Sequence, residues 1–216
     1  MTQPTSRSSP AFSFKQLTNL TAALEKAKRR GFLGPGPVGA HIEHALPILT
    51  LLSEDSREAL DLGSGGGVPG LVLAIARPGI RWTLLDGSVT RSRFLLHAVE
   101  HLELSHRVNV TALRAEEAAR TALRGTFDTV TSRGFGAPAV TAECGSPFLA
   151  PGGRLIVAEP PDGAPSRWPL QGLELLGMAP GVRVTSPSAF QVLEQVVQCA
   201  DRYPRRTGIP AKRPLF

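Results

Sequence analysis

The residues best suited to chemistry lie in one glycine-rich segment, DLGSGGGVPG, at positions 61–70. Glycine lets the backbone turn sharply and lets a ligand approach without meeting a Cβ atom. An apolar run precedes the segment and a helical run follows it, and free N–H groups at the start of a helix favour negative charge. We therefore predict a ligand-binding turn between a strand and a helix. The ligand-binding residues predicted in this turn are Asp61, Gly63, Gly65, Gly67 and Val68.

Two classes of ligand use such a turn. Gly65, Gly67 and Gly70 form the pattern G-x-G-x-x-G, which is the fingerprint of dinucleotide-binding proteins. Asp61 precedes the first glycine, however, and the run D-x-G-x-G-x-G resembles motif I of class I S-adenosylmethionine methyltransferases. This acid favours the methyltransferase interpretation over the dinucleotide one. A turn without any ligand ranks third, because so many glycines cost conformational entropy on folding.

The elements around the turn predict an α/β fold. Predicted strands cover 59–62, 82–85, 108–113, 127–131 and 155–158, and predicted helices between them cover 91–103 and 115–123. This alternation indicates βαβ units, and hence a mostly parallel, Rossmann-like sheet with helices on both faces. A helix at 170–176 and an antiparallel hairpin of 182–184 and 192–199 would close the sheet edge.

Four polar residues follow predicted strands and are expected to converge. They are Asp61, Asp86, Arg114 and Arg133. Ligands of open α/β sheets bind outside the carboxyl ends of the strands. Asp86 follows the second strand, where an acid binds the ribose of a nucleotide-like ligand.

The segments outside the sheet divide the chain into four parts. We expect a disordered tail at 1–13, a helical extension at 14–56, a methyltransferase domain at 57–201 and a basic tail at 202–216. Two helices are predicted in the extension, at 15–30 and 39–52, and Pro47 is expected to kink or split the second one.

Composition excludes several classes of protein. The 216 residues are 42% apolar and 19% charged, as in globular proteins. The net charge of +6 indicates nucleic acid or another anionic partner, with a merely basic surface as the alternative. Cys144 and Cys199 have no metal-binding or redox spacing, so we expect reduced thiols in a cytoplasmic protein. No apolar run approaches the ~20 residues of a membrane span, and no signal peptide is evident.

Four further motifs carry a resemblance to one family. Residues 86–95, DGSVTRSRFL, resemble the D-S-x-x-K-R-x-x-F-L element of the RsmG family, also called GidB. Residues 114–117, RAEE, resemble its R-x-E-E, and residues 127–133, FDTVTSR, resemble its F-D-x-x-x-S-R-A. The ending at 202–215, RYPRRTGIPAKRPL, is similar to its Y-P-R-K-x-G-x-P-x-K-x-P-L.

The resemblance implies an activity, a cofactor and site residues. The family methylates a guanine of small-subunit (16S) ribosomal RNA at N7 with S-adenosylmethionine. Gly63 and Val68 would then belong to the cofactor turn, and Asp86 would bind the ribose. Ala115 and Glu116 would flank the adenine, and Arg133 would lie near the transferred methyl group as the tentative catalytic residue.

Basic residues on a helix and in the tail are the predicted RNA contacts. They are Arg91, Arg93, Arg202, Arg205, Arg206, Lys212 and Arg213. Prolines would keep the tail extended, so that its charge can follow a phosphate backbone. The alternative is a solvated basic tail. The partner would be ribosomal RNA or the small subunit, and we expect a monomer.

Departures from the family pattern occur at Gly87, Thr90, Gly134 and Glu159. Cofactor binding is still expected despite these departures, but they leave open which RNA site is bound. The alternatives are a methyltransferase with another substrate and a protein that binds cofactor and RNA without catalysis.

The predicted chemistry needs no general base and no metal. N7 of guanine carries a lone pair and no proton, so alignment of the reacting groups is sufficient. Arg133 would hold a phosphate, the guanine carbonyl or the methionine carboxylate, or else form a structural ion pair with Asp61 or Glu116. The pairs His41/His44 and His97/His101 lack further ligands for zinc, so we expect surface or capping histidines.

Overall fold

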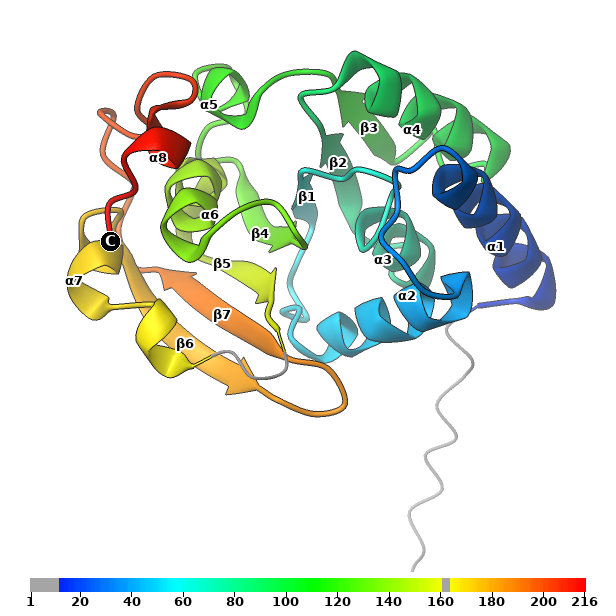
Figure 1. Cartoon of the computed structure of the whole chain (residues 1–216), viewed down its shortest axis with the longest axis horizontal. Helices are drawn as coiled ribbons and strands as arrows, with labels where there is room; N and C mark the ends of the chain where they lie inside the picture. The colour runs from blue at the N-terminus through cyan, green and yellow to red at the C-terminus, as the bar shows by residue number, and fades with distance from the viewer. Residues whose placement is uncertain (1–11, 161–163) are drawn as a thin grey trace, which may run out of the picture.

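A seven-stranded sheet forms the centre of the computed structural model, which describes residues 12–160 and 164–216 (Figure 1). Its strands are β1 (Glu58–Leu62), β2 (Arg81–Leu85), β3 (Val108–Thr111), β4 (Phe127–Ser132), β5 (Leu149–Ala158), β6 (Met178–Val184) and β7 (Phe190–Gln195). The order across the sheet is β3-β2-β1-β4-β5-β7-β6. Strands β1 to β5 run parallel, and β7 is antiparallel to both β5 and β6. The predicted α/β fold and its closing hairpin are confirmed.

Helices cover both faces of this sheet (Figure 1). One face carries α1 (Phe14–Arg29), α2 (Val38–Ala45), the 3-10 helix η1 (Leu46–Thr50), α3 (Gly70–Ala76) and α4 (Val89–His101). The other carries α5 (Ala115–Ala118), α6 (Pro138–Gly145), the 3-10 helix η2 (Ser146–Phe148) and α7 (Leu170–Glu174), with α8 (Ile209–Lys212) against α6. A short 3-10 turn, η3 (Pro165–Arg167), precedes α7. Neighbouring strand residues alternate between the two cores: Ala59 packs on the first face and Leu60 on the second. Strands buried on both faces are expected in parallel sheets.

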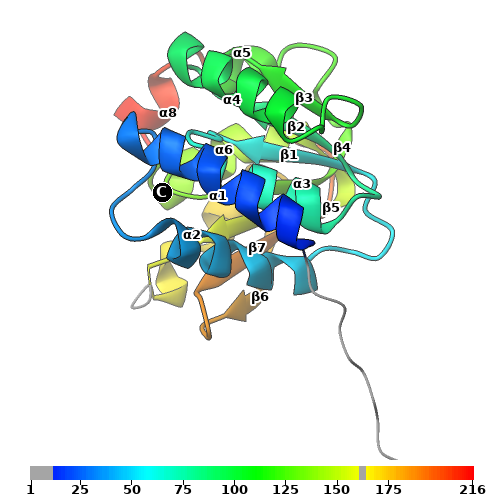
Figure 2. The same ribbon diagram turned by 90° about the vertical axis from the view of Figure 1, so that its right-hand side faces the viewer.

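The N-terminal helices belong to the first core. In α1, Leu20, Leu24 and Ala27 recur at helical spacing and are buried in the same cluster as Trp82 of β2. Ser13 begins the helix with a capping box, which satisfies backbone N–H groups at its N-terminus. Figure 2 shows α1 lying across this side of the molecule. The extension is therefore packed into the sheet domain and does not form a separate layer.

Three helices differ from the predictions. The helix predicted at 39–52 ends at Ala45 and continues as a 3-10 turn, because Pro47 has no N–H to donate. Helix α6 was missed, since most of its residues are buried and it therefore has no polar face to create a helical period. The helix predicted at 115–123 is a single turn, at Ala115–Ala118.

Within the described ranges, none of the helices is long and apolar enough to cross a membrane. The same residues contain no group of three or more His, Cys, Asp or Glu side chains that is placed to hold a metal ion.

Candidate active site

A cavity of about 630 Å³ opens at the carboxyl ends of the parallel strands. It lies where the chain order reverses around β1, with β2 on one side and β4 on the other. This is the ligand position of open α/β sheets, and the volume is within the ~300–1,000 Å³ of small-molecule sites. The predicted residues that line it are Gly63, Gly65, Val68, Asp86, Arg91, Arg114, Ala115, Glu116 and Arg133.

The backbone of the glycine turn lines the cavity, and Gly63 and Gly67 are required as glycines for different steric reasons. Gly63 has φ +72°, and a Cβ atom there would lie 2.6 Å from Cδ2 of Phe135. A Cβ on Gly67 would clash with Leu71 of α3, behind the turn. Gly67 does not line the cavity. Gly67 has a packing role that lets α3 approach the turn, and its contact with a ligand stays a prediction.

Asp61 supports the turn from below and does not line the cavity either. Its side chain is buried; Oδ2 accepts from the Gly70 N–H at 3.1 Å, and Oδ1 accepts from the Thr131 hydroxyl at 2.9 Å. Burial raises the pKa of Asp61 to about 6, against the opposing effect of these hydrogen bonds. Asp61, the acid that distinguished the two ligand classes, thus joins the turn to α3 and β4, and its direct contact with a cofactor stays a prediction.

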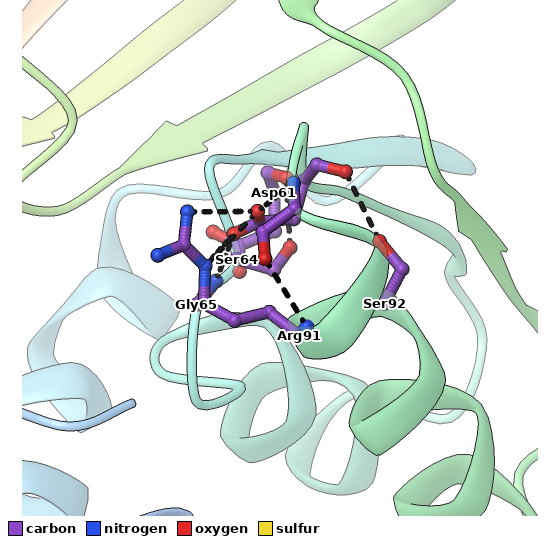
Figure 3. A network of polar contacts seen from close by, with 7 residues as sticks. Asp61, Ser64, Gly65, Arg91 and Ser92 are labelled. Carbon is purple, nitrogen blue, oxygen red and sulfur yellow. Dashed lines mark hydrogen bonds and ion pairs between the residues drawn. The ribbon is translucent and has the colours of Figure 1, made fainter. Parts of the chain in front are cut away.

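Asp86 connects the loops after β1 and β2. Figure 3 shows Gly65, Arg91 and Ser92 of the surrounding polar network. The Asp86 carboxylate accepts from the Gly65 N–H at 2.9 Å and from the Ser88 N–H at 2.8 Å. Arg91 forms an ion pair with it, at 3.0 Å. The Ser92 hydroxyl donates to the Asp86 carbonyl at 3.0 Å, which anchors α4 to the same point. Arg91, predicted as an RNA contact, therefore lines the cavity, and its guanidinium is paired with Asp86.

Arg133 follows the last residue of β4 and points to the N-terminal extension. Its Nη2 lies 2.6 Å from Nδ1 of His41 in α2, and Nε2 of His41 lies 3.2 Å from the Gly34 carbonyl oxygen. The two contacts require one tautomer, in which Nε2–H donates to Gly34 and Nδ1 accepts from Arg133. Burial, and next the charge of Arg133, lower the pKa of His41, which favours this neutral form. Among the described residues, neither Asp61 nor Glu116 forms an ion pair with Arg133.

His41 is the functional residue that sequence reasoning missed. It was expected at the surface or at a cap, although the segment 41–46, HIEHAL, has a loose similarity to the family pattern H-x-x-D-S-L. That similarity was the only available signal, because the partner is 92 residues away along the chain. The segment 31–34 between α1 and α2 also lines the cavity.

The C-terminal segment folds onto the site and is not extended, which corrects the prediction. Tyr203 and Pro204 are buried, and the short helix α8 follows. The Gly208 N–H donates to Oε1 of Glu116 at 2.9 Å, and Ala211 lines the cavity. Buried side chains and backbone contacts outweigh the tendency of the prolines to extend the chain.

The tail cations divide into two groups. Arg205 forms two hydrogen bonds, at 2.8 and 2.6 Å, with the fully buried carboxylate of Glu143 in α6, so it is a structural cation and not a free RNA contact. Arg202, Arg206, Lys212 and Arg213 are exposed, as is Arg93 on α4. For these five, RNA contact stays a prediction.

The cavity fits an adenosyl cofactor with a methionine end. The turn leaves room that a side chain would fill at Gly63, and acids stand at the ends of β2 and at the start of α5. Cys144 also lines the cavity, but burial raises the pKa of its thiol, which disfavours a nucleophilic thiolate. The site therefore offers binding and alignment and not covalent catalysis.

Comparison with known proteins identifies the family. Residues 37–159 match the family model of GidB, described as rRNA small subunit methyltransferase G. The chain is 31% identical over 188 residues to the ribosomal RNA small subunit methyltransferase G of Syntrophomonas wolfei, covering 84% of this chain and 87% of that relative.

Solved structures show the same fold. The T. Thermophilus 16S rRNA N2 G1207 methyltransferase RsmC, in complex with AdoMet and guanosine, matches with a TM-score of 0.53 and 20% identity over 78% of this chain and 43% of that one. An O-methyltransferase of Bacillus cereus in complex with SAH matches with a TM-score of 0.55 and 14% identity over 82% and 89% of the two chains. The fold is that of class I methyltransferases, and the family match extends over more than half of the sequence. The chain belongs to the GidB family, the rRNA small subunit methyltransferases G.

Proposed function

We propose that this protein transfers a methyl group from S-adenosylmethionine to N7 of a guanine in small-subunit ribosomal RNA. The observation that carries the proposal is the placement of Arg133, which follows β4 on the wall of a cavity formed by a glycine turn in a chain of the GidB family. Membership of that family supports the reaction and the RNA substrate, and the cavity supports the cofactor.

Several residues would hold the cofactor. The backbone at Gly63 and Gly65, with Val68, would surround the methionine end, and Asp86 would face the ribose. Ala115 and Glu116 would flank the adenine. When bound, this cofactor supplies an activated methyl group. Because Gly65, Ser88 and Arg91 already orient the Asp86 carboxylate, a ribose would meet an acceptor that is fixed in advance.

The reaction would proceed by alignment. N7 needs no deprotonation, and His41 uses its acceptor nitrogen for Arg133. Proximity and orientation of this kind supply ~7–11 kcal/mol of a reaction barrier. Arg133 would bind a phosphate, the guanine carbonyl or the methionine carboxylate, each of which suits a planar guanidinium. His41 fixes its direction.

The exposed cations support an RNA partner. Arg93, Arg202, Arg206, Lys212 and Arg213 would contact phosphates outside the cavity. We propose that the substrate is ribosomal RNA, alone or in an assembling small subunit. We further propose that the protein acts as a monomer in the cytoplasm, where such RNA is matured.

The test is methyl transfer to small-subunit RNA from cells that lack this protein. We expect labelled methyl groups from S-adenosylmethionine to appear at one guanine, and chain cleavage specific for 7-methylguanosine to map it. NAD should not compete with the cofactor. Incorporation at a base other than guanine would contradict the proposed substrate, and cofactor and RNA binding without any transfer would favour a non-catalytic protein.

A further inference from the structure

A second cavity of about 170 Å³ lies next to the first, at the carboxyl ends of β4 and β5. Gly134 and Phe135 line both cavities, so the two cavities adjoin at this segment. A liquid water takes ~30 Å³, so the second cavity is large enough for a flat ring system and is smaller than a site for a whole cofactor. It includes Glu159, one of the positions at which the sequence departs from the family pattern.

Two buried polar atoms in this cavity have no partner. Within residues 12–160 and 164–216, Oγ of Ser132 and Nε1 of Trp168 form no hydrogen bond, although the residues are only 2% and 4% exposed. Both residues line the second cavity. A buried polar atom without a partner costs about 1–3 kcal/mol, so such atoms require an explanation. A ligand with an acceptor atom would satisfy them.

A fixed carboxylate stands in the same cavity. Glu159 follows the last residue of β5 and is only 7% exposed. Its N–H donates to the Ala189 carbonyl at 2.9 Å, and its Oε2 accepts from Nη1 of Arg167 at 2.9 Å. A carboxylate offers about four acceptor sites, and the bond to Arg167 uses one. The cavity thus combines an anchored acceptor with two free donors.

We propose that the second cavity binds the Watson–Crick edge of the target guanine and selects guanine through Glu159. This inference rests on the proposed function. Guanine presents two donors, N1–H and N2–H, beside the acceptor O6. Glu159 would accept from the donors, and the Ser132 hydroxyl and the Trp168 N–H would both donate to O6. Adenine presents an acceptor at N1, which the carboxylate would repel.

The proposed orientation leaves the reacting atom free. N7 lies on the other edge of the purine, so it can face the first cavity across Gly134 and Phe135. In the transfer, the N7 lone pair forms the new N–CH3 bond, and the S–CH3 bond breaks with its electron pair going to sulfur. The positive charge moves from the sulfonium to the purine, and no proton moves. A carboxylate on the purine would stabilise this charge where it develops.

Nucleotide binding tests the proposal without methyl transfer. The full chain, loaded with S-adenosylhomocysteine, is titrated with guanosine or inosine 5′-monophosphate while the indole N–H signal of Trp168 is followed by NMR, assigned with Trp168→Phe. Inosine lacks only the N2 amino group. We expect the wild-type protein to prefer the guanosine nucleotide by about tenfold, and Glu159→Gln to lose this preference. A Trp168 signal that does not respond, or a preference that survives Glu159→Gln, would overturn the inference.

Single-turnover methylation gives the second measurement. We expect Glu159→Gln to slow methylation of small-subunit RNA by about tenfold or more, because a charged hydrogen-bond acceptor is lost. Affinity for S-adenosylhomocysteine should stay unchanged, because Glu159 does not line the first cavity. Glu174→Gln, an exposed glutamate on α7, is the matched control and should be normal. Normal methylation by folded Glu159→Gln would overturn the inference. Failure of the wild-type protein to methylate RNA would instead count against the proposed function.

Discussion

The first cavity has two walls of different origin. The strand-end wall consists of residues that follow β1 to β4 in the chain: Gly63, Gly65, Asp86, Glu116 of α5 and Arg133. The chain-end wall consists of segment 31–34 from the N-terminal extension and Ala211 from the C-terminal segment, and it is supported by His41 and Gly208. The first wall is made of motifs that are local in sequence, and the second exists only because distant segments fold against them.

Each chain end contacts one functional side chain of the strand-end wall. His41 binds Arg133, and the Gly208 N–H binds Glu116; each contact joins residues 92 positions apart. We infer from this comparison that the strand ends would supply the groups that bind the ligands, and that the chain ends would hold those groups in place. Substitutions in the two walls should therefore differ in what they damage.

The largest expected effect is on stability, at Arg205. Arg205→Ala should lower the free energy of unfolding by about 3 kcal/mol, because it leaves the fully buried charge of Glu143 without its partner. Arg206→Ala, its exposed neighbour, should hardly change stability. Chemical denaturation of the two variants measures the difference. Equal stability of both would mean that the tail does not anchor the chain-end wall.

The next effect is on turnover, at Arg133. Arg133→Ala should slow single-turnover methylation on the order of 100-fold, because misplacement of reacting groups is that costly. Arg133→Lys should recover only part of the rate, since lysine has no planar fork. Thermal unfolding of the same variants should remain near the wild-type value. A lower melting temperature with near-normal methylation per folded molecule would assign Arg133 to structure instead.

His41 tests whether the chain-end wall acts through Arg133. His41→Ala should reduce turnover by about tenfold, as expected for the loss of one hydrogen bond to a charged group. His41→Gln keeps an acceptor and should recover much of the rate. Cofactor affinity should change little. His97→Gln, an exposed histidine on α4, is the control. Equal turnover of His41→Ala and the wild-type protein would show that the chain-end wall does not act through Arg133.

The same residue predicts a pH dependence. The folded pKa of His41 lies below 6.5, because of burial and the charge of Arg133, with smaller effects from Lys28. The contribution of neutral His41 to the free energy of unfolding is therefore present above pH 6.5 and is lost as the pH falls through the folded pKa. Activity should fall over the same acidic range, since a protonated ring cannot accept from Arg133. His41→Gln should remove that acid limb from the pH–rate profile, and an unchanged limb would assign it to another group.

The smallest effect separates two arginines of α4. Arg93→Ala should reduce the salt slope of RNA binding by about one and leave cofactor affinity unchanged. Arg91→Ala should instead weaken cofactor binding, because Arg91 holds the Asp86 carboxylate. Calorimetry with S-adenosylhomocysteine and RNA binding at several salt concentrations distinguish the two. The reverse pattern would place Arg91 outside the cofactor site.

The sequence by itself determined the sheet and the strand-end wall. Apolar runs of strand length predicted β1 to β5, and parallel strands bring their carboxyl ends to one edge, so Asp86 and Arg133 had to converge. The glycine pattern predicted the turn correctly because glycine conformations are local. Motif similarity then predicted the family.

Tertiary structure alone decided what surrounds and supports that wall. Asp61 and Gly67 belong to the binding motif but face α3 and β4, because the turn has a buried side as well as a ligand side. Local prolines predicted an extended tail, yet Tyr203 is buried and Arg205 reaches Glu143 in a helix that has no sequence period. Local periodicity and spacing do not predict contacts between distant residues such as His41 and Arg133. They meet only when burial of the two cores brings distant segments together, which is why the chain-end wall was visible only in the fold.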